Sequence, residues 1–355
     1  MGGEVLLATC TGDPLRCAEL DLQVLSVIGV HGVIGEGEGR VVKASWTSGS
    51  RAELLGAGRI LVAGPGVVPE PSNAHVIVDI KDGMVSIRGE GVEWVVESFG
   101  CDPSTAATMY SAAIAGYLAK GYRLGRAVEE ARVLVEHALT YTGCKPRPIA
   151  LLEYRAARQG VVEDLKAGLK RLLAKGGLLV KAGLVPEVGI NIAEALPHPY
   201  TRSPGDVAAF PGRIMRTPWG LEATHPCPEF GSSSHLARAI LAMMRVHEDL
   251  RAAVNIRYSK EAVRAAEALG YRVSYYDRRE EPREVKEREG ATIPWGVEYA
   301  LKRVGYERLD LIYHTGDWGK EPMITVFAKT AEEAVVKVLA LAGVLVNGIK
   351  DHGAR

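Results

Sequence analysis

The second half of the chain alternates regularly between apolar, strand-like runs and amphipathic, helix-like runs, and this alternation limits the fold more than any other feature. Apolar runs at 253–257, 272–276 and 309–314 are separated by helix-patterned segments at 260–269 and 294–304. A glycine follows each helix-patterned segment, as expected where a helix ends. Strands and helices that alternate in this way bury their apolar faces against each other. We therefore expect an α/β fold with a central sheet flanked by helices.

Further elements complete this half. We expect a charged amphipathic helix over about 152–175, a strand at 322–328 and a final helix at 331–344. The Glu- and Arg-rich stretch 278–289 is most simply interpreted as a solvated loop, because runs of charge rarely enter a core.

The first half shows shorter elements of the same two kinds. The patterns predict strands at 4–9, 59–63 and 75–80 and helices at 16–28, 105–120 and 125–141. A length of 355 residues suits two domains better than one, and the proline-rich turn at 145–148 marks a boundary. We therefore predict two domains, 1–148 and 149–355.

Charge and hydropathy exclude two classes of partner. Lys plus Arg and Asp plus Glu each number 43, so the net charge is zero and we expect no nucleic-acid partner. The most apolar run, 334–346, contains Lys337 and is too short to cross a bilayer, so we expect no membrane partner. No signal peptide opens the sequence, and we expect a cytoplasmic protein. The scarcity of Gln and Asn beside abundant Arg, Glu and Val resembles thermophile composition.

The cysteines show no pattern typical of a disulfide framework or a zinc knuckle. They are odd in number, scattered and free of C-x-x-C spacing: Cys10, Cys17, Cys101, Cys144 and Cys227. This distribution suits a reducing compartment. The pair His225 and Cys227 could ligate a metal, but two ligands without a second pair are more often loop residues.

The stretch from Gly231 to His235 combines a short polar loop with the start of a helix. Ser232, Ser233 and Ser234 precede His235, and strong helix formers follow. Free backbone N–H groups and the helix dipole make such a junction suitable for binding phosphate. The simpler alternative is a serine N-cap with one partly exposed histidine.

Cationic residues follow or precede apolar strands elsewhere in the second half. Arg213 follows a glycine, Arg257 ends an apolar strand, and Lys320 lies in a glycine-rich loop. Ligands of α/β sheets bind in loops at strand ends, so convergence of these cations would form a phosphate or diphosphate site. Taken singly, Arg213 or Arg257 would more often form a surface ion pair. The sequence around Lys320 lacks the glycine spacing of a P-loop.

Six stretches between about 185 and 344 resemble the archaeal-type thiamine-phosphate synthase domain, the ThiN type. They read VPEVGINIAEALP, SPGDVAAFPGRI, FGSSSHLARAIL, NIRYSKEAVRAAEALG, ATIPWGVEYALK and GDWGKEPMI. They cover nearly half of the chain in order. The resemblance implies an enzyme of thiamine biosynthesis that condenses hydroxymethylpyrimidine diphosphate with hydroxyethylthiazole phosphate, giving thiamine phosphate and diphosphate.

The same resemblance assigns roles to individual residues. It implies that Arg213 and His235 are the catalytic pair, with Arg213 on the departing diphosphate and His235 on a phosphate oxygen or in proton transfer. It also implies Mg²⁺, because a diphosphate usually leaves as its metal complex. Asp317 or Asp277 would help to hold the ion, although both also suit turns. The candidate ligands for substrate phosphates are Asn191, Ser232, Ser233, Ser234, Arg257 and Lys320.

The first half resembles a hydroxymethylpyrimidine (phosphate) kinase of the ribokinase-like class, in shortened form. Residues 20–32 resemble that kinase's early helix, and 111–121 resemble its late helix. The kinase's glycine-rich anion hole is replaced by Thr105-Ala106-Ala107-Thr108, which lacks the glycines and the base. We expect a degenerate domain that serves folding, dimerisation or regulation. Exposed apolar helix faces at 105–141 would suit a homodimer.

Three other interpretations remain open from the sequence. The kinase half could retain activity, which would make the protein bifunctional. The chain could instead be a non-catalytic sensor of thiamine phosphate, but sensors of this kind tend to lose the catalytic residues, and Arg213 and His235 are both present. A serine hydrolase built on Ser232–His235 lacks a nucleophile-elbow pattern.

Overall fold

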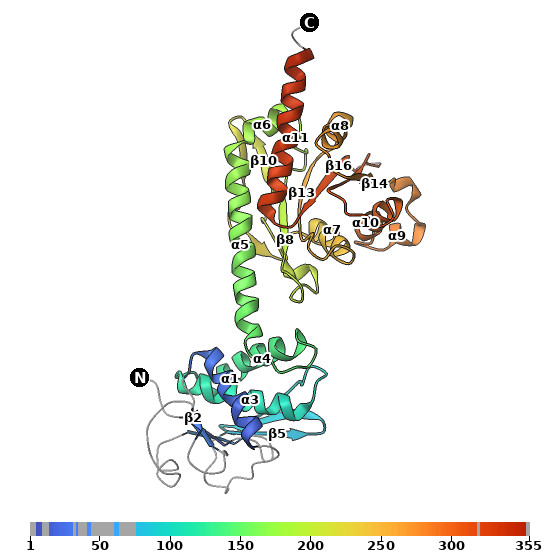
Figure 1. The fold of residues 1–355 in the computed structure, drawn as a ribbon. Coiled ribbons are helices and arrows are strands. Elements are labelled where there is room, and N and C mark those ends of the chain that lie inside the picture. The colour runs from blue at the N-terminus through green and yellow to red at the C-terminus, as the bar shows by residue number, and fades with distance from the viewer. Residues whose placement is uncertain are drawn as a thin grey trace. The chain divides into compact units, whose positions relative to one another are not determined.

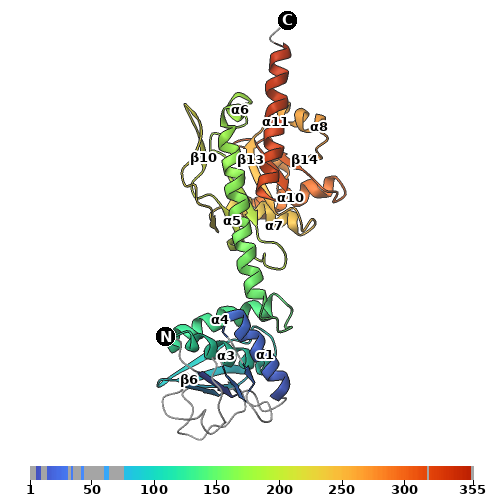
Figure 2. The same cartoon turned by 60° about the vertical axis from the view of Figure 1, so that its left-hand side comes forward.

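The computed structural model describes residues 5–8, 14–30, 33–34, 41–43, 60–63, 76–317 and 320–352. Its contacts divide the chain into two compact units, Met1–Arg155 and Ala156–Arg355. Each unit combines a seven-stranded sheet with helices, which confirms the predicted α/β class (Figures 1 and 2). The domain limits 1–148 and 149–355 stay a prediction.

Among its described residues, the first unit combines a mixed sheet with helices. Its elements are β1 (Val5–Ala8), α1 (Pro14–Ile28), β2 (Val33–Ile34), β3 (Val41–Lys43), β4 (Ile60–Ala63), β5 (Val76–Lys81), β6 (Met84–Gly89), β7 (Val92–Val96), α3 (Pro103–Ala119) and α4 (Leu124–Thr140). The strand order is β2-β3-β1-β4-β5-β6-β7, with β1, β4 and β5 parallel. The elements expected here are present, with ends displaced by a few residues.

Helix α3 is the core of this unit. Every residue from Ala106 to Ala119 is buried, and most of them are small. Small side chains let α1 and α4 approach closely, since a Cβ added at Gly116 would lie 3.0 Å from Leu25 Cδ2. The sequence analysis expected exposed apolar faces on the helices at 105–141. For α3 that expectation is wrong, because α1, α4 and the sheet cover this helix. The homodimer stays a prediction without that support.

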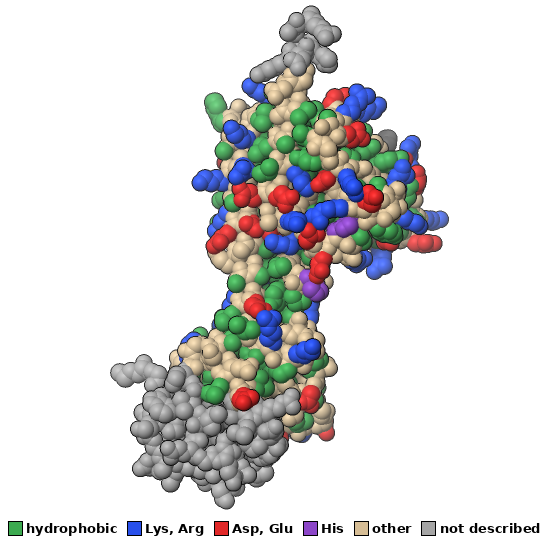
Figure 3. Space-filling view, viewed as in Figure 1, with side chains coloured by type: hydrophobic (Ala, Val, Ile, Leu, Met, Phe, Trp, Pro, Cys, Tyr) green, Lys and Arg blue, Asp and Glu red, His purple; other side chains and the backbone are tan. Residues whose placement is uncertain are grey.

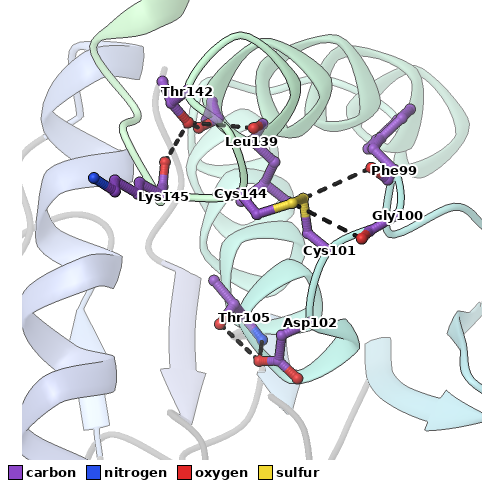
Figure 4. Close-up of a disulfide and its surroundings, with 10 residues drawn as sticks. Phe99, Gly100, Cys101, Asp102, Thr105, Leu139, Thr142, Cys144 and Lys145 are labelled. Carbon is purple, nitrogen blue, oxygen red and sulfur yellow. Dashed lines mark hydrogen bonds between the residues drawn. A yellow bond between two sulfur atoms is a disulfide. The ribbon is translucent and has the colours of Figure 1, made fainter.

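One pair of cysteines contradicts the expectation of no disulfides. Cys101 precedes α3 and Cys144 follows α4, and the antiparallel packing of the two helices brings their Cα atoms to 5.2 Å in a disulfide (Figure 4). The scattered spacing in the sequence gave no sign of this contact. Cys227 is free and exposed. Cys10 lies outside the described residues.

The second unit begins within α5 (Ala150–Ala174), which contains the limit between the units. Its helices and strands are α6 (Gly176–Lys181), β8 (Ile192–Ala195), β9 (Val207–Ala209), β10 (Ile214–Thr217), β11 (Gly220–Ala223), β12 (Glu229–Phe230), α7 (Ser234–Met244), β13 (Ala252–Arg257), α8 (Lys260–Ala268), β14 (Val273–Tyr275), α9 (Arg283–Glu287), α10 (Thr292–Arg303), β15 (Leu311–His314), β16 (Met323–Ala328) and α11 (Ala331–His352). The last helix is longer than expected, and the other predicted elements agree within a few residues.

The second sheet is covered on both faces. Its order is β12-β9-β8-β13-β16-β15-β14. Helices α7 and α10 bury one face, where Ala193, Ala253 and Phe327 join the core, and α11 and α8 cover the other (Figure 1). Helix α11 begins against buried Glu194 of β8, whose Oε2 accepts a hydrogen bond from Ala331 N–H at 2.7 Å. This layered arrangement is the predicted one.

The charged stretch 278–289 is not the fully solvated loop that the sequence predicted. It contains a 3₁₀ turn at Arg278–Glu280 and the short helix α9. The side chains of Arg278 and Glu281 are only 14% and 1% exposed. The fold buries these two charged side chains. A run of charged residues in the sequence does not show which of its members become buried.

Charged side chains of both signs are interspersed over the face of the second unit that Figure 3 shows. Among the described residues, none of the helices has the length and hydropathy needed to cross a bilayer.

Candidate active site

Three neighbouring strands of the second sheet bring polar residues to one edge. Arg257, the last residue of β13, lies opposite Met323, the first residue of β16. Met323 also lies opposite His314, the last residue of β15. Because β14 runs parallel to β15, the segment that starts at Tyr276 leaves the sheet at the same edge. The loops after β13, β14 and β15 therefore meet there.

Arg213 is fixed near this edge by backbone pairing. Ile190 and Ile214 exchange hydrogen bonds of 2.9 and 2.8 Å, and Asn255 Nδ2 donates to Gly189 O at 3.0 Å. Gly189 has a φ of +81°, and a Cβ at this position would lie 3.0 Å from Arg213 Cβ. Only glycine lets the two segments approach so closely. The half-buried Arg213 is thus held against the end of β13.

Asn191, a predicted phosphate ligand, is already engaged by the backbone. Its Nδ2 donates to Phe210 O at 3.0 Å, and its Oδ1 accepts from Ile192 N and Phe210 N at 2.8 and 3.2 Å. The residue is buried. These bonds join the start of β8 to the end of β9, so a positioning role fits the geometry directly. Contact with a phosphate stays a prediction.

His235 lies in the first turn of α7, as the sequence indicated. Ser233 is the N-cap, and its Oγ accepts from Leu236 N at 3.4 Å. Burial, followed by the positive charges of nearby cations, lowers the pKa of His235 to about 4. In order of effect these cations are Arg213, Arg278, Arg238 and Lys320. The imidazole is therefore neutral at pH 7.

Most of these cations have no ion-pair partner among the residues that the structure describes. Within the described part of the chain, no ion pair within 4.0 Å joins Arg213, Arg238 or Lys320 to a carboxylate. Arg278 has only a 4.0 Å contact with Glu281, and its buried Nε has no hydrogen-bond partner. Arg213, Arg238 and Arg278 are half-buried, whereas Lys320 is exposed. Half-buried cations are normally paired. Their excess around His235 favours a bound anion with several charges.

His314 adds a second imidazole to this cluster. It is buried, and its ring lies 5.2 Å from the ring of Tyr276. Gly316 N–H donates to His314 Nδ1 at 3.2 Å. Burial lowers the pKa of His314 to about 4, with further contributions from Arg278 and His235. Two neutral histidines and several cations thus surround one region.

A pocket of about 590 Å³ opens beside the cluster and contains three of the predicted residues, Arg257, Asp317 and Lys320. The full lining is Glu187, Val188, Arg257, Tyr258, Asp317, Lys320, Glu321 and Pro322. Glu321 does not compete with a phosphate for the cations, since its carboxylate accepts from Glu187 N and Val188 N at 2.9 and 3.4 Å. The positive charge of Lys320 also lowers the pKa of His235, so the pocket adjoins the cluster around this histidine.

The predicted serines and aspartates differ in their availability. Ser232 is half-buried and Ser234 is exposed at the start of α7, whereas Ser233 is used as the N-cap. Asp277 binds Arg279 through side chain and backbone, with an Nη2–Oδ2 distance of 2.6 Å. This contact lowers the pKa of Asp277 to about 2.

The fit for Mg²⁺ depends on the substrate. Among the residues that the structure describes, no three His, Cys, Asp or Glu side chains are grouped as a metal site. Mg²⁺ in phosphate-binding enzymes commonly takes one or two carboxylates plus substrate oxygens. Asp317 in the pocket fits that pattern, and Asp277 is occupied by Arg279. Both aspartates stay predictions as ligands of the ion.

Sequence reasoning missed Arg278, Arg238 and His314. Arg278 was hidden in the charged stretch, and Arg238 belongs to a regular helix pattern. Only the fold shows that Arg238 packs on the backbone, because a Cβ at Gly290 would lie 2.4 Å from its Cζ. His314 carried the one available signal, a histidine at the end of a predicted strand.

Comparisons with known proteins identify the family of the second unit. The family model Thiamine-phosphate synthase ThiN matches residues 164–340. The thiamine-phosphate synthase ThiN of Methanothermobacter thermautotrophicus is 42% identical over 159 residues, which are 44% of this chain and 82% of that protein. The crystal structure of the C-terminal domain of a phosphomethylpyrimidine kinase shares 45% identity over 52% of this chain and 99% of its own, with a TM-score of 0.48.

A fused relative extends the match. The bifunctional thiamine biosynthesis protein ThiDN of Methanocaldococcus jannaschii is 34% identical over 258 residues. That alignment is longer than the second unit, so it includes part of the first. It covers 71% of this chain and 56% of the relative, so the chain spans little more than half of that protein. The family model and the ThiN relative confirm the predicted resemblance to thiamine-phosphate synthases. The chain belongs to the ThiN family of thiamine-phosphate synthases.

Proposed function

We propose that the second unit joins hydroxymethylpyrimidine diphosphate to hydroxyethylthiazole phosphate and releases thiamine phosphate and diphosphate. The observation that carries this proposal is the group of cations around neutral His235: among the described residues Arg213, Arg238 and Lys320 have no ion pair with a carboxylate, and Arg278 has only a 4.0 Å contact with Glu281. Two substrates with several phosphate charges would supply the missing counter-charge. Membership of the ThiN family supports the same reaction.

The bond changes balance without a redox partner. The thiazole nitrogen supplies an electron pair to the methylene carbon of the pyrimidine, and a C–N bond forms. The C–O bond to the diphosphate breaks, and the diphosphate leaves with that electron pair. Negative charge grows on the leaving oxygens, so fixed cations that meet them lower the barrier.

The geometry supports a division of roles. Arg213, held rigidly against Gly189, meets the departing diphosphate. His235 is uncharged at pH 7 because its pKa is about 4, so it donates a neutral N–H to a phosphate oxygen or takes a proton. Arg257 and Lys320 hold a substrate phosphate in the adjoining pocket.

Mg²⁺ enters this proposal through the substrate. When bound, the ion would neutralise part of the charge on the diphosphate. Asp317 is the residue we expect to hold it, together with phosphate oxygens. The chain's own contribution remains the placement of Arg213, Lys320 and His235 around the anion.

A product assay tests the proposal. The purified full chain would be given both substrates and Mg²⁺, with His235→Ala and Arg213→Ala in parallel. Loss of either side chain should lower the rate roughly 10²- to 10³-fold, as for typical oxyanion stabilisers. Arg216→Ala is the matched control, because Arg216 is an exposed arginine in β10, the strand that follows Arg213. A folded wild-type chain that binds thiamine phosphate tightly but forms no product would instead support the sensor.

A second candidate function, kinase activity in the first unit, has one observation against it. Thr105–Thr108 lie in the first two turns of α3, and the carboxylate of Asp102 already accepts from Thr105 N at 2.9 Å (Figure 4). Hydrogen bonds from the side chain and then the backbone of Thr105 lower the pKa of Asp102, so a negative charge occupies the helix N-terminus where a kinase would bind phosphate. We propose a degenerate kinase-like unit. ATP-dependent phosphorylation of hydroxymethylpyrimidine by the full chain would contradict it.

A further inference from the structure

His314 has a bond that the proposed reaction does not explain. Its Nδ1 accepts the N–H of Gly316, so Nδ1 carries no proton and the neutral ring bears its proton on Nε2. The ring cannot turn over without losing this bond. The hydrogen bond thus fixes both the tautomer and the orientation of a buried histidine.

The bonded glycine belongs to the turn that carries Lys320. Gly316 has a φ of +85°, and a Cβ there would lie 2.5 Å from Lys320 O. Asp317 N donates to Lys320 O at 3.3 Å, and Lys320 N donates to Asp317 O at 2.8 Å. The two ends of the turn are therefore held together and to Gly316, so a shift of Gly316 moves Lys320.

We propose that His314 is a positioning residue, whose Nδ1 anchors the turn at Gly316 and so aims Lys320 at a substrate phosphate. The inference deepens the proposed function and rests on it for the identity of the substrate. The anchor persists at neutral pH, since the pKa of His314 is about 4 because of burial, Arg278 and His235. Tyr276 packs on the ring and keeps it in place.

Two substitutions separate the two ring nitrogens. In His314→Asn the amide oxygen takes the place of Nδ1 and can accept from Gly316 N–H. In His314→Gln the longer side chain reaches the place of Nε2 and leaves Gly316 N–H without that acceptor. Inorganic diphosphate, titrated into the full chain by calorimetry, reports anion binding without any chemistry.

The expected pattern is specific. His314→Gln should bind diphosphate roughly three- to tenfold more weakly than wild type, the usual value of one hydrogen bond. His314→Asn should stay within about twofold of wild type. Lys320→Gln should weaken binding, and adding His314→Gln to it should cause no further loss, because His314 acts through Lys320. In the synthase assay the same loss should appear in KM, with kcat unchanged.

Several results would overturn the inference: His314→Gln equal to wild type, His314→Asn as weak as His314→Gln, losses that multiply with Lys320→Gln, or no diphosphate binding by wild type. Retained binding in His314→Gln with loss in His314→Asn would point to direct substrate contact through Nε2 instead. ¹⁵N NMR of the wild-type ring needs no variant to fold, and a proton on Nδ1 would refute the anchor.

Failure of the inference and failure of the proposed function are distinguishable. If wild type makes thiamine phosphate but His314→Gln binds diphosphate normally, only the inference fails. If the binding pattern holds but no thiamine phosphate forms, the synthase proposal fails and the anchor stands.

Discussion

The most direct consequence of the site concerns the proton on His235. Its pKa falls from 6.5 to about 4, first because of burial and then because of Arg213 and the other cations. At about 1.4 kcal/mol for each pKa unit, protonation in the folded protein is disfavoured by roughly 3 kcal/mol. At pH 7 only about one molecule in a thousand would carry the charge. His235 therefore works as a neutral imidazole.

Histidine-labelled full chain, followed by NMR from pH 8 downward, measures this pKa. The His235→Gln variant identifies the resonance among the chain's 9 histidines. We expect a midpoint near pH 4, coupled to that of His314. Arg213→Gln should raise it, because a positive charge is removed. Arg257→Gln is the matched control and should change it less, since Arg257 is not among the main charges that lower this pKa.

Bound anion supplies a second test of the same reasoning. Inorganic diphosphate adds negative charge beside the cations, so it should raise the pKa of His235. A free-protein pKa of about 6 or higher would refute the argument that burial and unpaired cations control this residue. So would a pKa that does not respond to Arg213→Gln.

Two further predictions concern stability. Burial raises the pKa of Glu194 from 4.5 to about 8 despite Arg251 and the Ala331 N–H. The contribution of the protonated carboxyl to folding stability is therefore fully present below pH 4.5 and is lost as the pH rises through 8. Urea unfolding should therefore show wild type losing roughly 1–3 kcal/mol more than Glu194→Gln between pH 5 and pH 9, and parallel profiles would contradict this assignment. Removal of the disulfide by Cys101→Ser should lower the stability of the first unit by up to roughly 4 kcal/mol, because the bond closes a loop with a sequence separation of 43. Calorimetry of the first unit's transition measures it; Cys227→Ser is the control, and an unchanged midpoint in Cys101→Ser would show that the bond does not form.

Much of the local structure follows from the sequence. Ser233 caps α7 and His235 lies in its first turn, as the polar loop before a helix pattern indicated. Helices α8 and α10 end within two residues of the glycines that predicted their ends. These features depend on interactions between residues a few positions apart, so the sequence carries them directly. The ThiN resemblance named Arg213 and His235, and their catalytic roles stay predictions.

Tertiary structure alone decided which of these residues are buried, paired or charged. Arg278 turns inward from a stretch that looked solvated, Asn191 is engaged by the backbone, and Cys101 meets Cys144 across two packed helices. Each outcome depends on residues that are distant in the chain and on the water that packing removes. Desolvation and strand register act over the whole fold, so a local pattern cannot report them. The sequence by itself determined the elements and the family of this protein, and the packed sheet determined the state of its site.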